Sequence, residues 1–263
     1  MKQKVWSIIT VFVFGMALTA CGDRFPDYHY KMTIHAGGKA FSSVRAVEQE
    51  EVSTVLDSTG RTVKRSMRGE AVIIDHPDGH TYYALLGKPG NPDYATLIVG
   101  AALRDYIPQN QPKSDVEREL AEMKATEPDI SSGDNLRDMA ERSRAMTEVE
   151  GPHDLPRRLP PRNGRPPFEA WPMFVTFSDP SDPKTVREVS PESIGVSRIT
   201  IEITDEDVTT GIEQRLPQSL WHRWVEIHRQ ELSRPGGLKA NHNNPYFDSL
   251  LAKLDKTSFV IED

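Results

Sequence analysis

Two segments far apart in the chain alternate between apolar and polar side chains, and their positions limit the folds open to it. Residues 28–36 place apolar side chains at every second position from Tyr28 to Ile34, and residues 198–204 repeat the pattern with isoleucine. A period of two predicts half-buried strands. Helical patterns lie between the strand groups instead of alternating with each strand, which favours an antiparallel sheet. We therefore predict the α+β class, with a mainly antiparallel sheet and packed amphipathic helices.

The remaining apolar runs predict a hairpin, several helices and further strands. Residues 71–75 and 81–86 flank His76-Pro77-Asp78-Gly79, a sequence typical of a turn because proline presets φ and glycine accepts a positive φ. Apolar side chains at helical spacing predict the helices. These cover residues 94–106, 114–126, 131–148 and 218–232 and a last stretch that begins at Asn244-Pro245, while strands are predicted at residues 41–56, 173–177 and 258–261.

The stretch from residue 108 to residue 172 differs in composition from the chain on either side. Its two charged helical patterns have only thin apolar stripes, and residues 151–172 contain seven prolines and four arginines. We predict that residues 151–172 form an extended, partly mobile connection. Residues 28–107 and 173–263 then form one domain, from which residues 108–172 make a charged helical and proline-rich excursion.

The first 22 residues are typical of an export signal. Lys2 and Lys4 precede an apolar run of 14 residues that ends at Leu18. This run is shorter than the roughly 20 residues that a permanent membrane helix needs, and small residues follow it in place of a charged stop-transfer flank. We therefore predict that residues 1–20 are a signal peptide that is removed.

The sequence Leu18-Thr19-Ala20-Cys21 resembles the lipobox of bacterial lipoproteins. The resemblance implies that lipid is attached to the thiol of Cys21, that the chain is cut before it, and that residues 21–27 form a lipidated tether. The alternative is an ordinary secretory signal with an incidental cysteine. Gly22, and not aspartate, follows the cysteine, which by resemblance to enteric lipoproteins implies the outer membrane, with the protein facing the periplasm.

Charge and cysteine content argue against several kinds of partner and site. The 263-residue chain has a formal charge of −7, and removal of the signal, with two lysines and no acid, makes it −9. This sign argues against a nucleic-acid partner. Cys21 is the only cysteine, so an exported chain has no internal disulfide and no spare thiol. The strong catalytic, nucleotide-binding and metal-binding fingerprints do not occur, so no catalytic residue, metal ligand or cofactor is assigned.

Several groups of polar side chains suggest chemistry, and each also has a simpler structural explanation. His76 and His80 bracket a turn with Asp75 and Asp78, which resembles a metal-ligand set, but we interpret them as an exposed hairpin tip. The acidic run 205–207 could hold calcium, and is more typical of a solvated turn. The other groups are His29 with His35, then His222, Glu226 and His228, and last the arginines Arg157, Arg158, Arg162 and Arg165. The functional alternative for the first group is a pH-sensitive contact, for the second it is catalysis, and for the arginines it is binding of anionic headgroups or polymers.

Trp221 and Trp224 are the candidate partner contacts. They lie three residues apart on the predicted helix 218–232, so they are neighbours on its surface. They either bury together in the core, which we favour, or form an exposed anchor for another protein.

Short runs on both sides of the proline-rich stretch resemble a group of uncharacterised proteobacterial proteins. The resemblance implies no activity, and it supports one domain built from both halves. The runs include Lys31-Met32-Thr33-Ile34, Phe41-Ser42-Ser43-Val44, Arg68-Gly69-Glu70-Ala71-Val72, Val175-Thr176-Phe177, Asp182-Pro183-Lys184-Thr185-Val186, Ile199-Thr200-Ile201-Glu202-Ile203-Thr204 and Thr209-Thr210-Gly211-Ile212-Glu213.

We expect a lipid-anchored cell-envelope protein that is noncatalytic and acts through contacts with a protein or a polymer. The alternatives are a hydrolase of envelope polymers and a small-ligand-binding lipoprotein. A tight pocket with two titratable groups of opposed pKa shift would favour the enzyme, and a large apolar cleft the ligand binder. An exposed apolar patch would favour the partner protein.

Overall fold

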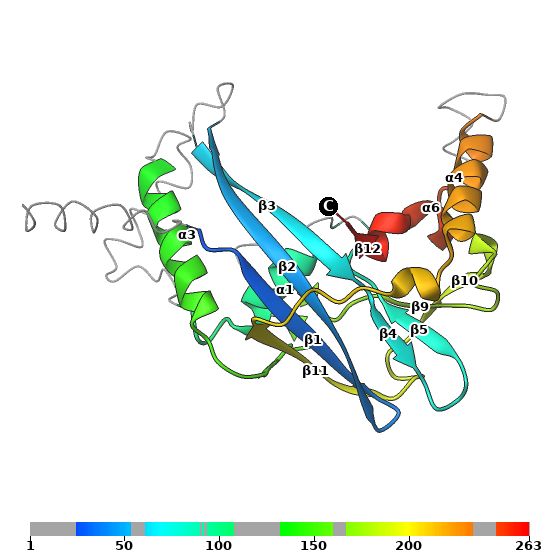
Figure 1. The fold of residues 1–263 in the computed structure, drawn as a ribbon, viewed down its shortest axis with the longest axis horizontal. Coiled ribbons are helices and arrows are strands. Elements are labelled where there is room, and N and C mark those ends of the chain that lie inside the picture. The colour runs from blue at the N-terminus through cyan, green and yellow to red at the C-terminus, as the bar shows by residue number, and fades with distance from the viewer. Residues whose placement is uncertain are drawn as a thin grey trace, which may run out of the picture.

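The computed structural model describes residues 25–53, 61–89, 91, 94–107, 132–159, 167–233 and 246–262. Both helices and antiparallel sheets are present, so the predicted α+β class is confirmed (Figure 1). The first sheet has the order β12-β3-β2-β1-β11-β6. Its strands are β1 (Tyr28–Ala36), β2 (Lys39–Ser53), β3 (Arg61–Glu70), β6 (His153–Asp154), β11 (Val196–Thr204) and β12 (Val260–Ile261).

The two alternating segments are neighbours in the first sheet. β1 pairs antiparallel with β11, with Met32 opposite Ile201 and Ile34 opposite Ile199. Side chains in β1 alternate between buried and partly exposed along its whole length, as the period of two predicts. Strands from the two halves of the chain therefore share one apolar face.

The second sheet contains the predicted hairpin and has the order β10-β9-β5-β4. β4 (Val72–Asp75) and β5 (Thr81–Ala84) pair across the turn, and β5 also pairs with β9 (Phe174–Phe177), which precedes β10 (Val186–Val189). A separate pair is formed by β7 (Arg158–Leu159) and β8 (Phe168–Glu169).

The second sheet is covered on both faces. One face packs with the first sheet and α1 (Tyr94–Ala102) in a cluster we call the inter-sheet core, which includes Tyr30 and Phe174. The other face packs with α4 (Gln218–Leu232) and the C-terminal residues in a second cluster, the α4 core. α6 (Leu250–Lys253) and the single-turn helices η1 (Pro183–Thr185), η2 (Ile212–Gln214) and η3 (Lys256–Ser258) complete the described fold.

The described parts of the proline-rich stretch, residues 151–159 and 167–172, pack against the rest of the fold. Leu155 and Ala170 are buried in the inter-sheet core, and β6 adds to the edge of β11. Two backbone amides and one side chain of this stretch are hydrogen-bonded: the Leu155 amide donates to the carbonyl of Ile199, the Ala170 amide to the carbonyl of Arg157, and the Trp171 indole to the carbonyl of Leu155. Large side chains at a few positions therefore hold both described parts of this stretch on the fold, while residues 160–166 lie outside the described residues.

Two of the predicted helices are shorter in the structure: the one predicted at residues 94–106 is α1, which ends at Ala102, and the other is the last helix. The helix predicted at residues 131–148 is α3 (Ser132–Thr147), whereas the one predicted at residues 114–126 lies outside the described residues. The last helix is only the four residues of α6, because Ser249 caps its start and accepts a hydrogen bond from the amide of Ala252. Residues 246–249 before it form turns.

Residues 205–211, the crossing segment, run from β11 across the outer face of the first sheet to η2, as Figure 1 shows. Glu206 forms an ion pair with Lys31 on β1. Farther along, the Thr209 amide donates to the Val44 carbonyl, and the Val44 amide donates to the Thr209 hydroxyl. The segment thereby satisfies backbone groups of β2 at a point before its pairing with β3 begins at Ala46.

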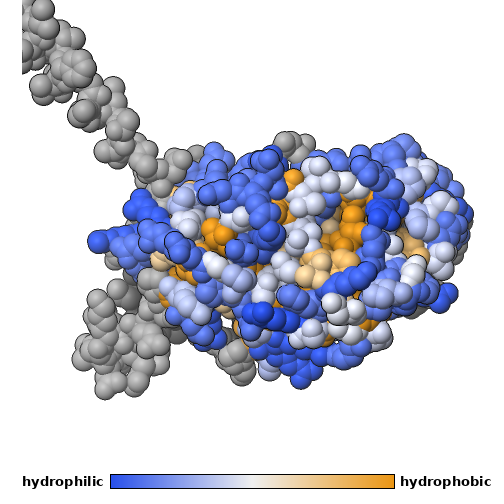
Figure 2. All heavy atoms as spheres, turned by 60° about the horizontal axis from the view of Figure 1, so that its bottom comes forward, coloured by the Kyte–Doolittle hydropathy of each residue, from blue (hydrophilic) through white to orange (hydrophobic). Residues whose placement is uncertain are grey.

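The surface is mainly hydrophilic, with a few hydrophobic patches between polar side chains on the face drawn in Figure 2. The large apolar side chains that are most exposed in the described ranges are Leu97 on α1, Tyr106 after α1, and Val225 and Leu232, which both lie on α4. None of the helices in these ranges has both the length and the apolar character to cross a membrane.

Candidate functional site

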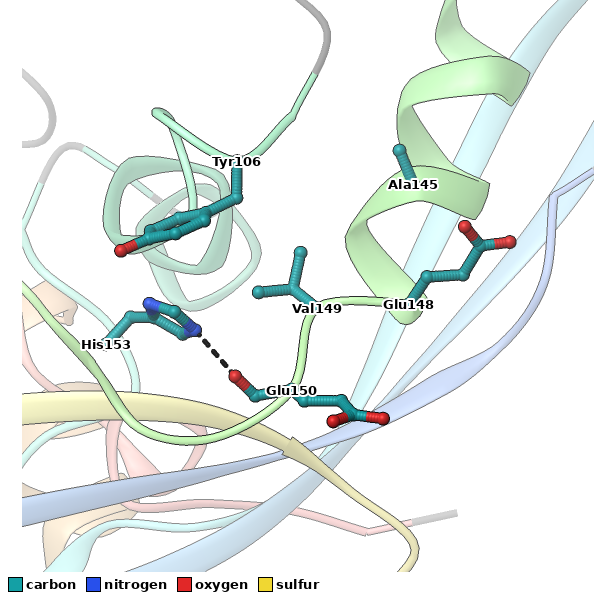
Figure 3. Close-up of a pocket in the computed structure, with 6 residues that line it drawn as sticks. All are labelled: Tyr106, Ala145, Glu148, Val149, Glu150 and His153. Atoms are coloured by element: carbon teal, nitrogen blue, oxygen red, sulfur yellow. Dashed lines mark hydrogen bonds between the residues drawn. The ribbon is translucent and has the colours of Figure 1, made fainter.

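An open hollow lies between the end of α1 and the end of α3 (Figure 3). Its volume is about 530 Å³. It is lined by Tyr106, Ala145, Glu148, Val149, Glu150 and His153.

An aromatic pair forms one wall of this hollow. The chain turns after α1, the Tyr106 amide donates to the carbonyl of Leu103, and the Tyr106 side chain is left 58% exposed. Its ring lies on the imidazole of His153, with 4.2 Å between centroids. His153 is held from behind, because β6 pairs with β11 at Ile201. The sheet therefore fixes the position of this wall.

Hydrogen bonding also fixes the orientation of the imidazole. His153 Nε2 lies 2.9 Å from the carbonyl oxygen of Glu150. A carbonyl can only accept, so Nε2 carries the proton and Nδ1 is the free acceptor of the neutral ring. The side chains of Glu148 and Glu150 are exposed at the rim, beside the partly buried Val149. An exposed ring with nearby carboxylates can bind a cationic or hydroxyl-bearing group through its face and through charge-assisted hydrogen bonds.

The histidine hairpin is an internally bonded group. Asp78 accepts hydrogen bonds from the amide of His80 at 2.8 Å and from the hydroxyl of Tyr82 at 2.7 Å. His76 Nδ1 is 3.0 Å and His80 Nδ1 is 3.4 Å from the same carboxylate. The His80 amide, together with Tyr82 and His76, holds the pKa of Asp78 well below its usual value. The Asp78 carboxylate therefore stabilises the turn.

The β1–β2 turn packs against this hairpin. Gly37 has a φ of +55°, and a Cβ at this position would lie 2.6 Å from His76 Nε2. Only glycine therefore accommodates both the backbone conformation and the contact. Within the described ranges, no group of three or more histidine, cysteine or acidic side chains is placed to hold a metal ion.

One histidine of β1, His29, contacts the acidic run 205–207 of the crossing segment. His29 Nδ1 lies 2.8 Å from the Glu206 carbonyl oxygen, while the Glu206 side chain pairs with Lys31. His35, at the other end of β1, is separate from this contact and partly exposed. The central acid of the run is therefore used to hold the segment on the sheet.

The polar side chains of α4 are not brought together as a site. The Glu226 carboxylate accepts hydrogen bonds from Arg229 and Gln230 on the same helix. His228 Nδ1 is 2.9 Å from the Tyr246 hydroxyl, and His222 is exposed. These contacts match the simpler structural explanation.

The arginine cluster is paired with acids. Arg157 forms ion pairs with Glu169 and Glu192, and its guanidinium lies 5.5 Å from the centroid of the Trp171 ring. Arg158 also lies near Glu169, at 3.5 Å. These two arginines therefore have acidic partners within the protein, while Arg162 and Arg165 lie outside the described residues.

The structure buries both candidate partner contacts. Trp221 and Trp224 are each 4% exposed and stack on one another in the α4 core, with 6.0 Å between ring centroids. Trp224 Nε1 donates to the carbonyl of Leu251 at 2.9 Å. The pair is therefore core and does not form an exposed anchor.

Comparison with known proteins gives no match to a family, to a curated protein or to a solved structure. The hollow was not predicted from the sequence, because its two aromatic side chains come from segments 47 residues apart, one in a predicted helix and one in the proline-rich stretch. No local pattern could have brought Tyr106 and His153 together.

Proposed function

We propose that this protein is a lipid-anchored protein of the cell envelope that acts noncatalytically, through contacts with a protein or a polymer. The observation that carries the proposal is the position of the only cysteine, directly after an export signal and a Leu-Thr-Ala sequence. The described structure starts at Phe25, four residues after Cys21, and Phe25 is buried in it.

The membrane is the first proposed partner, through lipid on Cys21. Each acyl chain contributes about 0.8 kcal/mol per buried CH₂, so several chains on one residue anchor stably where one does not. Gly22 after the cysteine favours the outer membrane, with the body facing the periplasm. The acidic chain argues against a nucleic-acid partner.

An envelope protein or polymer is the second proposed partner, and the Tyr106 hollow is where we place it. The support is an aromatic side chain that is held by His153 and yet remains largely exposed. Tyrosine is enriched among residues that dominate binding energy, since its ring offers a large, rigid contact area.

Replacement of the cysteine tests the anchor. Cys21→Ala should abolish incorporation of labelled fatty acid, and it should leave an unprocessed precursor or a chain cut elsewhere. Cell fractionation then shows whether the wild-type protein sediments with the outer membrane. Fatty acid that still labels the variant would contradict the proposal.

Crosslinking from position 106 tests the contact. A photoreactive amino acid at residue 106 should give an envelope adduct in cells, whereas the same group at the exposed residue Val225 should not. His153→Ala should weaken the adduct, because it removes the support of the Tyr106 ring. Equal crosslinking from positions 106 and 225 would exclude the hollow as the contact site.

A further inference from the structure

The chain enters the body through a small apolar cluster at one end of the molecule. Phe25 is 3% exposed and packs with Leu136 and Ala140 of α3, and Val63 and Met139 lie against it. We call this group the entry cluster. It fixes the point at which any anchor on the N-terminal side must meet the folded protein.

The next two residues are also bound to the body. The Gln49 amide donates to Asp27 Oδ1, and the Gln49 side chain donates to the carbonyl of Pro26, each at 2.7 Å. The side-chain nitrogen of Gln49, Nε2, also donates to the hydroxyl oxygen of Ser143 on α3 at 2.6 Å. Residues 25–27, predicted as part of a tether, are therefore held between β2 and α3.

The distance from the lipid to this point is short. An extended residue spans at most about 3.3–3.6 Å, so four residues place the Cα of Cys21 no more than about 14 Å from that of Phe25. The body is too close to its anchor to turn freely. The end that carries the entry cluster must stay near the bilayer.

We propose that α3 and the adjoining part of the β2–β3 ribbon face the phospholipid headgroups, and that α4 faces away from the membrane. This inference rests on the proposed lipid anchor at Cys21. Figure 1 supports the second half, since α3 and the start of the described chain lie at one end of the long axis and α4 lies at the other.

The side chains of the proposed surface suit a polar headgroup layer. Arg144 of α3 is exposed, as are Lys64 and Arg65, which point to opposite faces of β3, and such cationic side chains bind phosphate oxygens. Acidic side chains lie among them, with Glu141 paired to Arg137. The anchor therefore supplies the binding energy, the short connection to the entry cluster sets the orientation, and the polar surface is compatible with it.

Depth-dependent quenching of two single-label proteins tests the orientation. Lipidation uses the thiol of Cys21, so a cysteine introduced by Arg144→Cys on α3 or Val225→Cys on α4 is the only reactive thiol. Each full-length lipidated protein is labelled with a fluorophore and reconstituted into phosphatidylethanolamine–phosphatidylglycerol vesicles that contain nitroxide-headgroup phospholipid. We expect quenching at position 144 to be several-fold stronger than at position 225. Equal or reversed quenching would overturn the orientation.

A third variant separates the role of the entry cluster from that of the lipid. Phe25→Ala in each labelled protein should keep the lipid but bring the quenching ratio toward one, because the chain is then released from α3. An unchanged ratio would show that the entry cluster does not set the orientation. The mass of each protein is measured first: a chain without lipid on Cys21 would overturn the proposed function and, with it, the orientation, whereas a lipidated chain with reversed quenching would overturn the orientation alone.

Discussion

Arg45 is the residue whose environment departs most from what its chemistry favours. It is fully buried in the middle of β2. Its Nε donates to the Glu70 carbonyl at 3.2 Å, and its Nη1 lies 3.4 Å from the Tyr30 hydroxyl. In the described part of the chain, no carboxylate forms a salt bridge with it and its Nη2 has no hydrogen-bond partner. A buried charge without a counter-charge costs free energy, so we expect the charge of this guanidinium to destabilise the folded state.

We therefore expect Arg45→Met to unfold at the same urea concentration as the wild type or at a higher one. Methionine fills a similar volume without charge, and the Tyr30 hydroxyl keeps its bond to the Ala95 carbonyl. Arg45→Ala leaves a cavity and should lower the free energy of unfolding by about 2–5 kcal/mol. Equal losses in the two variants would show that the guanidinium is net stabilising.

Glu70 joins two distant parts of the chain. Its carboxylate accepts hydrogen bonds from the amides of Gly211 at 2.8 Å and Ile212 at 3.0 Å, so it caps η2 and ends the crossing segment. Glu70→Ala leaves both amides without this acceptor, and each buried group that loses its partner should lower the free energy of unfolding by about 1–3 kcal/mol. Glu70→Gln keeps one acceptor oxygen and should lose less. Urea midpoints of the two variants check this order.

The same carboxylate gives a pH dependence with a definite sign. Burial raises the pKa of Glu70 above its usual value of 4.5. Because the pKa of Glu70 is higher in the folded state than in the unfolded state, its protonation contributes to the free energy of unfolding. This contribution is complete at pH values below the unfolded pKa, and it is lost as pH rises through the folded pKa. The stability advantage of the wild type over Glu70→Gln should therefore narrow from below pH 4.5 toward neutral pH. A stability advantage of the wild type that grows over this pH range would contradict a raised pKa for Glu70.

At the scale of the element, α4 depends on its two tryptophans. Both are buried, and both contact Phe259 on the C-terminal segment. Trp221→Ala and Trp224→Ala should each lower the free energy of unfolding by about 3–5 kcal/mol. Substitution with phenylalanine separates the contribution of packing from that of hydrogen bonding. Trp224→Phe also loses the hydrogen bond to the Leu251 carbonyl. Trp221→Phe loses no such bond, because Trp221 Nε1 has no hydrogen-bond partner among the described residues.

His222→Ala is the matched control on the same helix. Its side chain is exposed, and exposed substitutions usually change stability by less than about 0.5 kcal/mol. Denaturant midpoints measure all of these variants. Tryptophan variants that melt like the control would contradict burial in the α4 core.

At the scale of the whole molecule, both halves of the chain build the same sheets. β1 pairs with β11 along eight residues, and β5 pairs with β9. The inter-sheet core then joins side chains from both halves. The fold is consequently not divisible at the proline-rich stretch.

A protease site inserted within residues 160–166, outside the described residues, tests this unity. After cleavage, the two fragments should elute together from a sizing column without denaturant, because strand pairing and the inter-sheet core hold them. The same insertion without protease is the control. Fragments that separate in native buffer would show two independent domains.

Patterns among neighbouring residues are enough to predict the local elements and the class of fold. The strands β1 and β11, the Pro-Asp-Gly turn of the second sheet and the helical spacing in α4 all arise from patterns of neighbouring residues, so they could be predicted without the structure. Burial alternates as predicted in β1 but not in β11, where Thr200 is buried together with Ile199 and Ile201. What covers each face of these elements depends on long-range packing. The burial of Arg45, the packing of Leu155 and the pairing of Tyr106 with His153 depend on segments that lie far apart in the chain. A periodic pattern shows which side chains share a face, but long-range packing decides whether that face meets the core, another segment or solvent.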